Sequence, residues 1–201
     1  MKRVIYAVMM VGAALMWGCN KDEDMLTKQK DAIVRYLTSS RRLVAKEDVG
    51  NVIEENPPFY TQFGQDVFQH ITNYYEEGRT EWALVEPTST LDINFAAYIF
   101  SGSEPSKQQL YWSNISALIS EVESSNNNQY DHLIWSEEPL TLQLGNGSVV
   151  RGLEEALIGC HAQDSVQVYM TSAAAYGKHA LGMVPRNSSV AWYIKILNVT
   201  K

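Results

Sequence analysis

The sequence predicts an α+β fold in which an antiparallel sheet curls over one short helix. Two runs near the C-terminus, Ser165–Met170 and Val190–Asn198, alternate apolar and polar residues with the period of a β-strand. Between the turn signal Gly145-Asn146-Gly147 and the first of these runs, Leu153 and Leu157 stand one helical turn apart. A short helix at this point would press an apolar stripe onto the strands that precede and follow it.

Composition sets the scale of the protein and argues against one class of function. The chain has 201 residues, of which 45% are hydrophobic, which is enough for one globular domain with extensions. Its formal net charge is −7 at pH 7. Because binding to nucleic acid depends on neutralising phosphates with a basic surface, this balance indicates no nucleic-acid partner.

The cysteines and histidines indicate neither a disulfide nor a metal site. Cys19 falls in a targeting segment, and Cys160 falls where the predicted helix gives way to a strand. We therefore interpret Cys160 as a buried free thiol. The histidines show no ligand spacing, and we interpret them as structural or exposed rather than metal-binding: His70, His132, His161 and His179.

The N-terminus resembles a bacterial lipoprotein signal. Lys2-Arg3 forms a basic start, Val4–Trp17 is a short apolar stretch, and Gly18-Cys19 is followed by a polar run. The apolar stretch is too short for a membrane-spanning helix. We predict that residues 1–18 are a signal peptide and that Cys19 carries a lipid anchor; an ordinary signal peptide with an incidental cysteine is the alternative.

The residues after Cys19 bear on location. Lys21-Asp22-Glu23 resembles the acidic tag that follows the lipidated cysteine in surface lipoproteins of some Gram-negative groups. The predicted location is therefore the cell envelope, as an outer-membrane lipoprotein that faces the periplasm or the cell surface.

A helix and a linker are predicted between the leader and the main domain. Met25–Ser39 places apolar residues such as Ile33 and Leu37 among charged ones, as in an amphipathic helix. This helix either acts as a spacer or homodimer-forming arm, or packs on its own domain. Arg41–Pro58 is polar and ends in two prolines, so we expect residues 19–58 to be a helical spacer followed by a loop linker.

Two segments of the middle of the chain have a readable periodicity. Gln65–Tyr75 favours a strand that leads into the main domain, with a short helix as the alternative. Within Ile115–Trp135 a helix is expected from the spacing of Ile115, Leu118, Ile119 and Val122. The polar run Ser124–Asn128 that follows is typical of a mobile surface loop.

Motifs in the C-terminal half occur in an order typical of one enzyme family. Val149–Leu157 reads Val-Val-Arg-Gly-Leu-Glu-Glu-Ala-Leu, Ala175-Tyr176-Gly177 precedes a Gly-bearing loop, and Val184-Pro185 precedes the last alternating run. This order resembles the C-terminal core of the FKBP-type peptidyl-prolyl cis-trans isomerases. The resemblance extends back to Leu91–Gly102, and so covers roughly Leu91–Leu197.

The resemblance sharpens the predicted architecture. It implies an FKBP-like domain over residues 59–201, in which an antiparallel half-barrel sheet curls around the short helix. An insertion at about residues 103–135 interrupts the pattern of smaller family members. The helix before residue 58 would then be an N-terminal helical extension of this domain.

The same resemblance implies a dry aromatic cavity as the substrate site. Tyr176, Phe95 and Trp192 take the catalytic positions. The Tyr176 hydroxyl and the Val150 backbone N–H are expected to bind substrate carbonyls. The residues expected to bind the substrate around them are Tyr111, Trp112, Leu140, Val149, Val150, Leu153, Met183 and Val184. Neither a metal nor a cofactor is implied, because twisting an imide bond needs no nucleophile and no acid–base pair.

Some positions depart from the family pattern. Phe95 stands where the family has Tyr, Trp112 where it has Asp, and Arg186 where it has the second Pro of a pair. The first two changes remove a hydroxyl and a hydrogen-bond acceptor from the cavity. Tyr111 stands at a position that is Phe in the family.

The predicted function is that of a peptidyl-prolyl cis-trans isomerase that assists the folding of exported proteins, with proline-containing polypeptides as its partners. The departures favour an alternative, a catalytically weak FKBP-like module that binds peptides or proteins on the cell envelope. A third hypothesis, a surface glycan-binding lipoprotein, depends only on the lipoprotein signal and the abundant aromatic residues.

Overall fold

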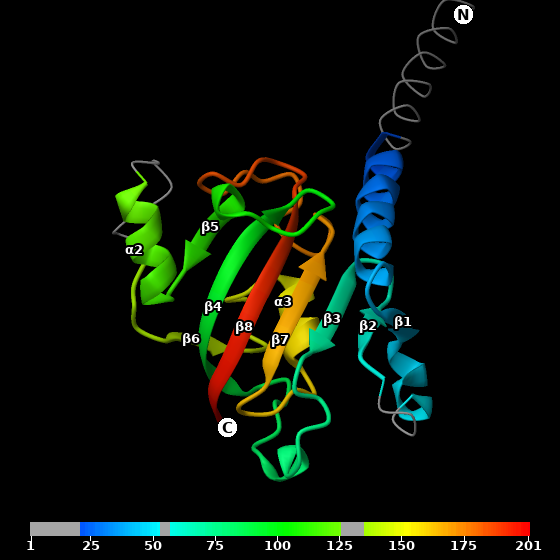
Figure 1. Ribbon diagram of the computed structural model, residues 1–201, viewed down its shortest axis with the longest axis vertical. Helices are drawn as coiled ribbons and strands as arrows, with labels where there is room; N and C mark the ends of the chain where they lie inside the picture. The colour runs from blue at the N-terminus through cyan, green and yellow to red at the C-terminus, as the bar shows by residue number, and fades with distance from the viewer. Residues whose placement is uncertain (1–20, 53–56, 126–134) are drawn as a thin grey trace, which may run out of the picture.

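The computed structural model describes residues 21–52, 57–125 and 135–201, and its main element is an eight-stranded sheet (Figure 1). The strand order is β1-β2-β3-β7-β8-β4-β5, and β6 also pairs with β4. The strands are β1 (Arg42–Ala45), β2 (Phe59–Phe63), β3 (Val67–Ile71), β4 (Thr90–Phe100), β5 (Leu110–Ser113), β6 (Leu140–Gln143), β7 (Ser165–Met170) and β8 (Ser189–Thr200).

Helices lie on both faces of this sheet. One spans the described residues 21–38 and is called the N-terminal helix below. The others are α2 (Ser116–Ser124), α3 (Arg151–Leu157) and the short 3-10 helices η1 (Lys46–Asn51), η3 (Arg79–Glu81) and η4 (Lys107–Gln109). Within the described residues, none of the helices has the length and apolar content needed to cross a membrane.

Antiparallel pairing holds the centre of the sheet together. β8 pairs with β4 on one side, from Ser189 to Thr200, and with β7 on the other. The single parallel pair among the described strands is β1 with β2, so the sheet is mixed where the sequence indicated antiparallel pairing alone. The physical reason is the long connection over residues 46–58, since parallel neighbours need a crossover of about a dozen residues.

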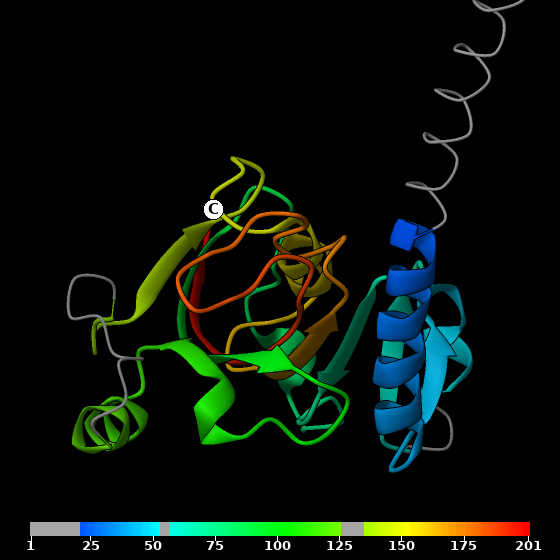
Figure 2. The ribbon, with the colours of Figure 1, turned by 90° about the horizontal axis from the view of Figure 1, so that it is seen from above.

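The inner face of the sheet holds the larger core. Alternate residues of β7 and β8, such as Val168 and Trp192, are buried in one cluster with Leu153 and Leu157 of α3. Seen from above, the sheet curls so that α3 and the segment after β7 lie on its inner side (Figure 2). The predicted α+β architecture, a curled sheet over a short helix, is confirmed.

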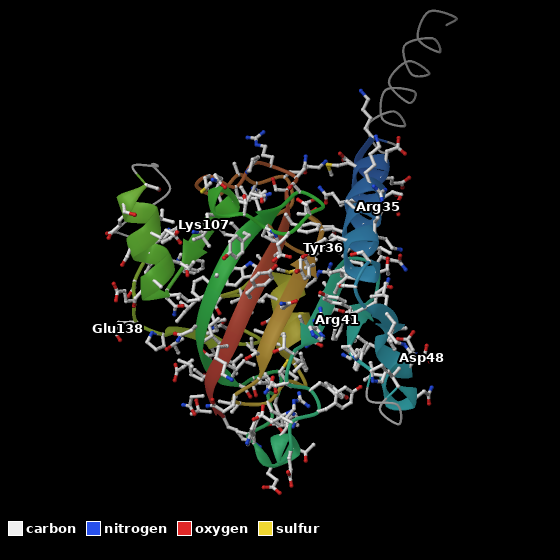
Figure 3. All side chains as sticks on the ribbon, viewed as in Figure 1. Arg35, Tyr36, Arg41, Asp48, Lys107 and Glu138 are labelled. Carbon is white, nitrogen blue, oxygen red and sulfur yellow. The ribbon has the colours of Figure 1, made fainter. Side chains whose placement is uncertain are left out.

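The N-terminal helix covers part of the outer face. Ile33 and Leu37 are fully buried there in a cluster with Phe68 and Tyr169 of the sheet. Tyr36 points from the helix toward the same strands, where its ring contacts that of Tyr169 (Figure 3). Of the two roles considered for this helix, its apolar stripe therefore serves packing on its own domain.

Part of the segment expected to be a loop linker belongs to the sheet. β1 pairs with β2, and Val44 and Val52 are buried beside Phe59. The expectation was wrong because β1 is an edge strand of only four residues, too short to show an alternation within a mostly polar segment.

Other expected elements are confirmed. β3 lies within Gln65–Tyr75, and all five of its residues are buried because both faces of the sheet are covered at this point. α2 buries Ile119 and Val122 against Leu110 and the rest of a small satellite cluster.

Several predictions lie partly or wholly outside the described residues. These are the signal peptide over residues 1–18, the lipidation of Cys19, and the polar run at Ser124–Asn128 beyond residue 125. Cys160 is within them and is a fully buried free thiol, as predicted. Burial raises the pKa of its thiol well above the usual value, so it is protonated and unreactive.

Candidate functional site

A cavity of about 180 Å³ opens on the inner face of the sheet, between α3, β6, β8 and the loop after Tyr176. Its lining is apolar and aromatic, with one phenol and one serine, and contains no charged side chain. The residues that line it are Trp112, Leu140, Leu142, Ser148, Val149, Val150, Leu153, Tyr176, Leu181 and Trp192.

The floor between the strands depends on a small residue flanked by two large ones. Ala97 of β4 is the register partner of Trp112 on β5 and of Trp192 on β8, so all three project from the same face. The two indole rings meet edge to face, with centroids 5.8 Å apart and planes at 87°. A larger side chain at Ala97, which is fully buried, would fill the space between them.

Phe95 lies behind these tryptophans rather than on the cavity surface. Its ring stacks on Trp192 with centroids 5.0 Å apart and meets Trp112 edge to face at 4.7 Å. Phe95 is 1% exposed, so it supports the aromatic wall without reaching the open space. Phe95 was predicted to contact the substrate directly, but it does not line the cavity.

A bulge in β5 turns two consecutive side chains toward the same face. The register passes from Ala97 opposite Trp112 to Tyr98 opposite Leu110, which leaves Tyr111 as the extra residue. A β-bulge re-aims side chains in this way. Both Tyr111 and Trp112 consequently contact Trp192, with ring centroids 6.5 and 5.8 Å away. Tyr111 is almost completely buried and does not line the cavity itself.

Helix α3 supplies the opposite wall through Val149, Val150 and Leu153. The helix lies close to the strand beyond it because residue 152 is glycine. A Cβ on Gly152 would lie 2.6 Å from the Met170 sulfur and 2.8 Å from Ala174 Cβ. The Gly152 N–H donates to the Ala174 carbonyl at 2.9 Å, which ties the helix start to the turn that carries Tyr176.

Val150 presents a free backbone donor at this wall. It is the N-cap of α3, and its carbonyl accepts hydrogen bonds from Leu153 and Glu154. Within the described part of the chain, its own N–H donates no hydrogen bond. A backbone N–H at a cavity wall is a donor for a ligand carbonyl.

Tyr176 is held by a compact turn after β7. The Gly177 N–H donates to the Ser172 carbonyl at 2.8 Å, and Gly177 takes φ of 59°, a left-handed conformation that suits glycine. The Tyr176 hydroxyl lies 3.1 Å from the Tyr111 hydroxyl, and the two rings meet edge to face. The phenol is the one side-chain hydroxyl on the aromatic side of the cavity.

The loop above the cavity differs from the expected arrangement. A turn closed by mutual backbone hydrogen bonds between Leu181 and Val184 brings Leu181 to the cavity and leaves its side chain 51% exposed. Val184 is 1% exposed and packs into the core, and Met183 packs against the same core. The expectation that Met183 and Val184 line the cavity fails because Gly182, with φ of 55°, reverses the chain between them and Leu181.

Seven of the predicted site residues are therefore brought together around one cavity: Trp112, Leu140, Val149, Val150, Leu153, Tyr176 and Trp192. Phe95 and Tyr111 back its wall, and Met183 and Val184 lie in the core. The sequence reasoning missed Leu142, Ser148 and Leu181. Leu142 could have been found from its alternation with Leu140, whereas Leu181 depended on a loop conformation that periodicity does not encode.

Nothing in the described residues resembles a metal centre. No group of three or more His, Cys, Asp or Glu side chains comes together in that part of the chain. Arg79 and Asp164 form a buried ion pair, with Nε to Oδ1 at 2.7 Å and Nη2 to Oδ2 at 2.6 Å. The pair ties the segment before β4 to the turn before β7, away from the cavity.

Comparisons with known proteins find similarity to one enzyme family. Residues 120–197 match the family model described as FKBP-type peptidyl-prolyl cis-trans isomerase. The chain is 33% identical over 61 residues to FK506-binding protein 4 of Chaetomium thermophilum, covering 30% of this chain and 13% of that protein. It is 30% identical over 64 residues to FK506-binding protein 3 of Eremothecium gossypii, covering 32% of this chain and 15% of that protein.

Residues 120–197 thus resemble an FKBP-type domain, with weak similarity to FK506-binding proteins, and the α+β fold is FKBP-like with a sheet that is not closed. The chain spans only a small part of the length of these relatives. The matched residues include α3, Tyr176 and Trp192, whereas Phe95, Tyr111 and Trp112 lie before them.

Proposed function

We propose that this protein is a peptidyl-prolyl cis-trans isomerase that acts on proline-containing segments of exported proteins. The observation that carries the proposal is the aromatic cavity with two donors at its edge, the Tyr176 hydroxyl and the Val150 N–H. The FKBP-type match over residues 120–197 supports the same reaction class.

The chemistry of the reaction suits a cavity of this kind. Rotation about an imide bond crosses a barrier of about 18–20 kcal/mol, because the twisted bond loses its resonance. The twisted carbonyl is less polar than the planar one, so the removal of water costs it less hydration free energy. A dry aromatic wall such as Trp192 and Trp112 therefore favours the twisted state over the ground state.

The size of the cavity fits one residue rather than a large ligand. A volume of about 180 Å³ corresponds to roughly six water molecules at about 30 Å³ each in the liquid. This is enough for a five-membered ring and is well below the roughly 300–1,000 Å³ typical of pockets for drug-sized ligands. Trp112, which stands in place of an acid, lines the cavity without closing it.

The two donors would hold the peptide on either side of the proline ring. Burial raises the pKa of the Tyr176 hydroxyl above its usual value, so the phenol stays protonated near neutral pH and donates. The Val150 N–H would bind a second carbonyl of the same extended segment. Leu181, exposed at the rim, would contact the neighbouring side chain of the substrate.

The proposed setting is the cell envelope. Residues 1–18 would be removed as a signal peptide, and Cys19 would carry a lipid that anchors the protein in the outer membrane, facing the periplasm or the cell surface. Metabolic labelling with a fatty-acid analogue tests this point. Incorporation in the wild type and its loss in Cys19→Ser supports the anchor, and an unlabelled wild type contradicts it.

Self-association is a separate part of this proposal. A homodimer through the N-terminal helix would have to use the exposed side of that helix, because Ile33 and Leu37 are buried against the sheet. Sedimentation equilibrium of the lipid-free chain distinguishes a monomer from a dimer.

A refolding assay tests the isomerase directly. The full chain with Cys19→Ser, which has no lipid, is added at micromolar concentration to a protein whose refolding is limited by proline isomerisation. We expect the slow phase to accelerate in proportion to the added protein. An unchanged slow phase contradicts the proposed catalysis.

Trp112 favours a second candidate, a peptide-binding module on the same fold. It lines the cavity where the family pattern places an acid, so a hydrogen-bond acceptor is replaced by an apolar ring. Saturable binding of a proline peptide without any acceleration of its isomerisation would distinguish this function from the enzyme.

A further inference from the structure

Two tyrosine hydroxyls share a hydrogen bond behind the cavity, and their burial differs. The hydroxyl oxygens of Tyr111 and Tyr176 are 3.1 Å apart. Tyr176 lines the cavity, whereas Tyr111 is 8% exposed and does not reach the open space. Its ring contacts Trp192, but among the described residues its hydroxyl bonds only the Tyr176 hydroxyl.

The backbone is built to bring Tyr111 to this position. In a regular strand, Tyr111 and Trp112 would point to opposite faces. The bulge opposite Ala97 and Tyr98 turns both toward Trp192. Tyr111 is a phenol at a position where the FKBP-type family pattern has Phe. Conversely, Phe95 lacks a hydroxyl at a position where that pattern has Tyr.

The surroundings fix the direction of the bond between the two hydroxyls. In that bond either hydroxyl could donate, and the buried Trp192 Nε1 has no hydrogen-bond partner among the described residues. If Tyr176 donated, the buried Tyr111 proton would have no acceptor, and an unsatisfied buried donor is costly. The Tyr111 proton is thereby left to point at Tyr176.

The pKa shifts of the two phenols agree with a hydrogen bond that Tyr111 donates to Tyr176. Burial, and then the neighbouring Tyr176, raises the pKa of Tyr111 well above the usual value. Burial also raises the pKa of Tyr176, but the bond from Tyr111 lowers it, as expected for the partner that accepts. Tyr111 donates, Tyr176 accepts, and the Tyr176 proton is free on the cavity side.

We propose that Tyr111 is a positioning residue that holds the Tyr176 hydroxyl as a donor toward the cavity, so that the site selects substrates with a carbonyl oxygen at that point. The inference rests on the proposed function of the cavity. The bond from Tyr111 polarises the Tyr176 hydroxyl, which makes it a better donor toward the cavity.

A double-mutant cycle tests this role. The variants are Tyr111→Phe, Tyr176→Phe and the double variant, with kcat/KM and Kd measured for one Xaa-Pro peptide. We expect Tyr111→Phe to lower kcat/KM by about two- to tenfold, the range set by one neutral hydrogen bond. Added to Tyr176→Phe, it should cause no further loss, because Tyr111 acts only through that hydroxyl.

The outer face of the sheet offers a matched control. Tyr169 and Tyr193 also join their hydroxyls, at 3.0 Å, away from the cavity. Tyr169→Phe removes a hydroxyl of the same kind and should leave kcat/KM unchanged. Melting temperatures of all variants separate loss of folded protein from loss of function.

A direct titration gives a readout that does not depend on catalysis. In protein labelled with ¹³C at tyrosine Cζ, Tyr111→Phe should raise the pKa of Tyr176, since the donated bond is lost. An unchanged Tyr176 pKa, or a Tyr111→Phe variant with wild-type kcat/KM, overturns the inference alone. The inference is also overturned if Tyr111→Phe lowers kcat/KM by the same factor in the Tyr176→Phe variant as in the wild type. A wild type that neither binds nor isomerises the peptide overturns the proposed function and this inference together.

Discussion

The two faces of the sheet carry similar aromatic side chains and use them differently. On the outer face, Tyr169 packs with Phe68, and the N-terminal helix closes over them. On the inner face, Trp192 packs with Phe95, and α3 covers only one side, so that a cavity remains. Each face also has one pair of tyrosine hydroxyls about 3 Å apart, Tyr169 with Tyr193 outside and Tyr111 with Tyr176 inside.

The comparison teaches that aromatic content alone does not make a site. The outer cluster is covered by the N-terminal helix, which is described over residues 21–38, whereas α3 has seven residues and a cavity remains beside it. Burial on the outer face contributes to stability, and incomplete burial on the inner face leaves surface for a ligand. Substitutions on the two faces should therefore separate stability from binding.

The largest expected effect lies on the sealed face. Leu37 is fully buried beneath the helix, so Leu37→Ala should lower the free energy of unfolding by about 2–5 kcal/mol, through lost burial and a residual cavity. Kd for a proline peptide should not change in the folded fraction. Urea unfolding and peptide titration on the same variant measure both. A changed Kd would show that the two faces are coupled.

A smaller effect is expected where α3 meets the sheet. Gly152→Ala places a Cβ within 3.0 Å of Met170 and Ala174, so α3 and the turn that carries Tyr176 must move. We expect a loss of about 1–3 kcal/mol in unfolding free energy, as in other overpacked cores. Peptide affinity should fall as well, in contrast to Leu37→Ala. Retained affinity would mean that the cavity does not depend on this contact.

A backbone donor gives a sharper probe of the inner face. Val150 has φ of −65° and an N–H without a partner among the described residues, so proline fits its backbone and removes only the donor. Val150→Pro should weaken peptide binding by about 0.5–1.5 kcal/mol, the net worth of one hydrogen bond. Val150→Ala keeps the N–H and is the control for the lost side chain. Equal losses in both variants would remove the N–H from the site.

The pH dependence of stability should come from the outer face. Burial lowers the pKa of His70, whose Nδ1 lies 2.6 Å from the Phe59 carbonyl beside the Tyr60 ring. The folded state therefore prefers the neutral imidazole. Its contribution is complete above the unfolded pKa of about 6.5 and is lost as pH falls from there through the lowered folded pKa.

The measurement is unfolding free energy between pH 7.5 and 5, in the wild type and in His70→Gln. The wild type should lose stability as pH falls below about 6.5, and the variant should lose less. Burial also lowers the pKa of His161, so this residue contributes a dependence of the same sign in both proteins. Identical slopes for the two proteins would show that His70 titrates alike in the folded and unfolded states.

Periodicity revealed the regular parts of the molecule. β7, β8 and α3 follow from the alternation at Ser165–Met170 and Val190–Asn198 and from the spacing of Leu153 and Leu157, since each segment buries one face. β1 was missed because its four residues are too few to show a period, although three of them are apolar.

The parts of the site that could not be predicted depend on contacts between distant segments. The bulge at Tyr111 is defined by the register between β4 and β5, and no residue type in the sequence predicts it. Leu181 reaches the cavity through a turn at Gly182 that is selected by the whole loop. Such features decide which side chains line the cavity, so the family pattern named residues of its walls but not Leu181 of the loop.

If a proline ring enters the inner cavity and isomerises there, the tryptophans of the cavity wall report its entry directly. In ¹⁵N-labelled protein, titration with an Xaa-Pro peptide should shift the indole N–H signals of Trp112 and Trp192 and the Val150 amide, with saturation. The indoles of Trp82 and Trp135, outside the cavity lining, should stay in place. The cis and trans peptide signals should exchange faster in the same sample. Shifts confined to Trp82, Trp135 or the outer face, or no saturable shift with unchanged cis–trans exchange, would contradict the account.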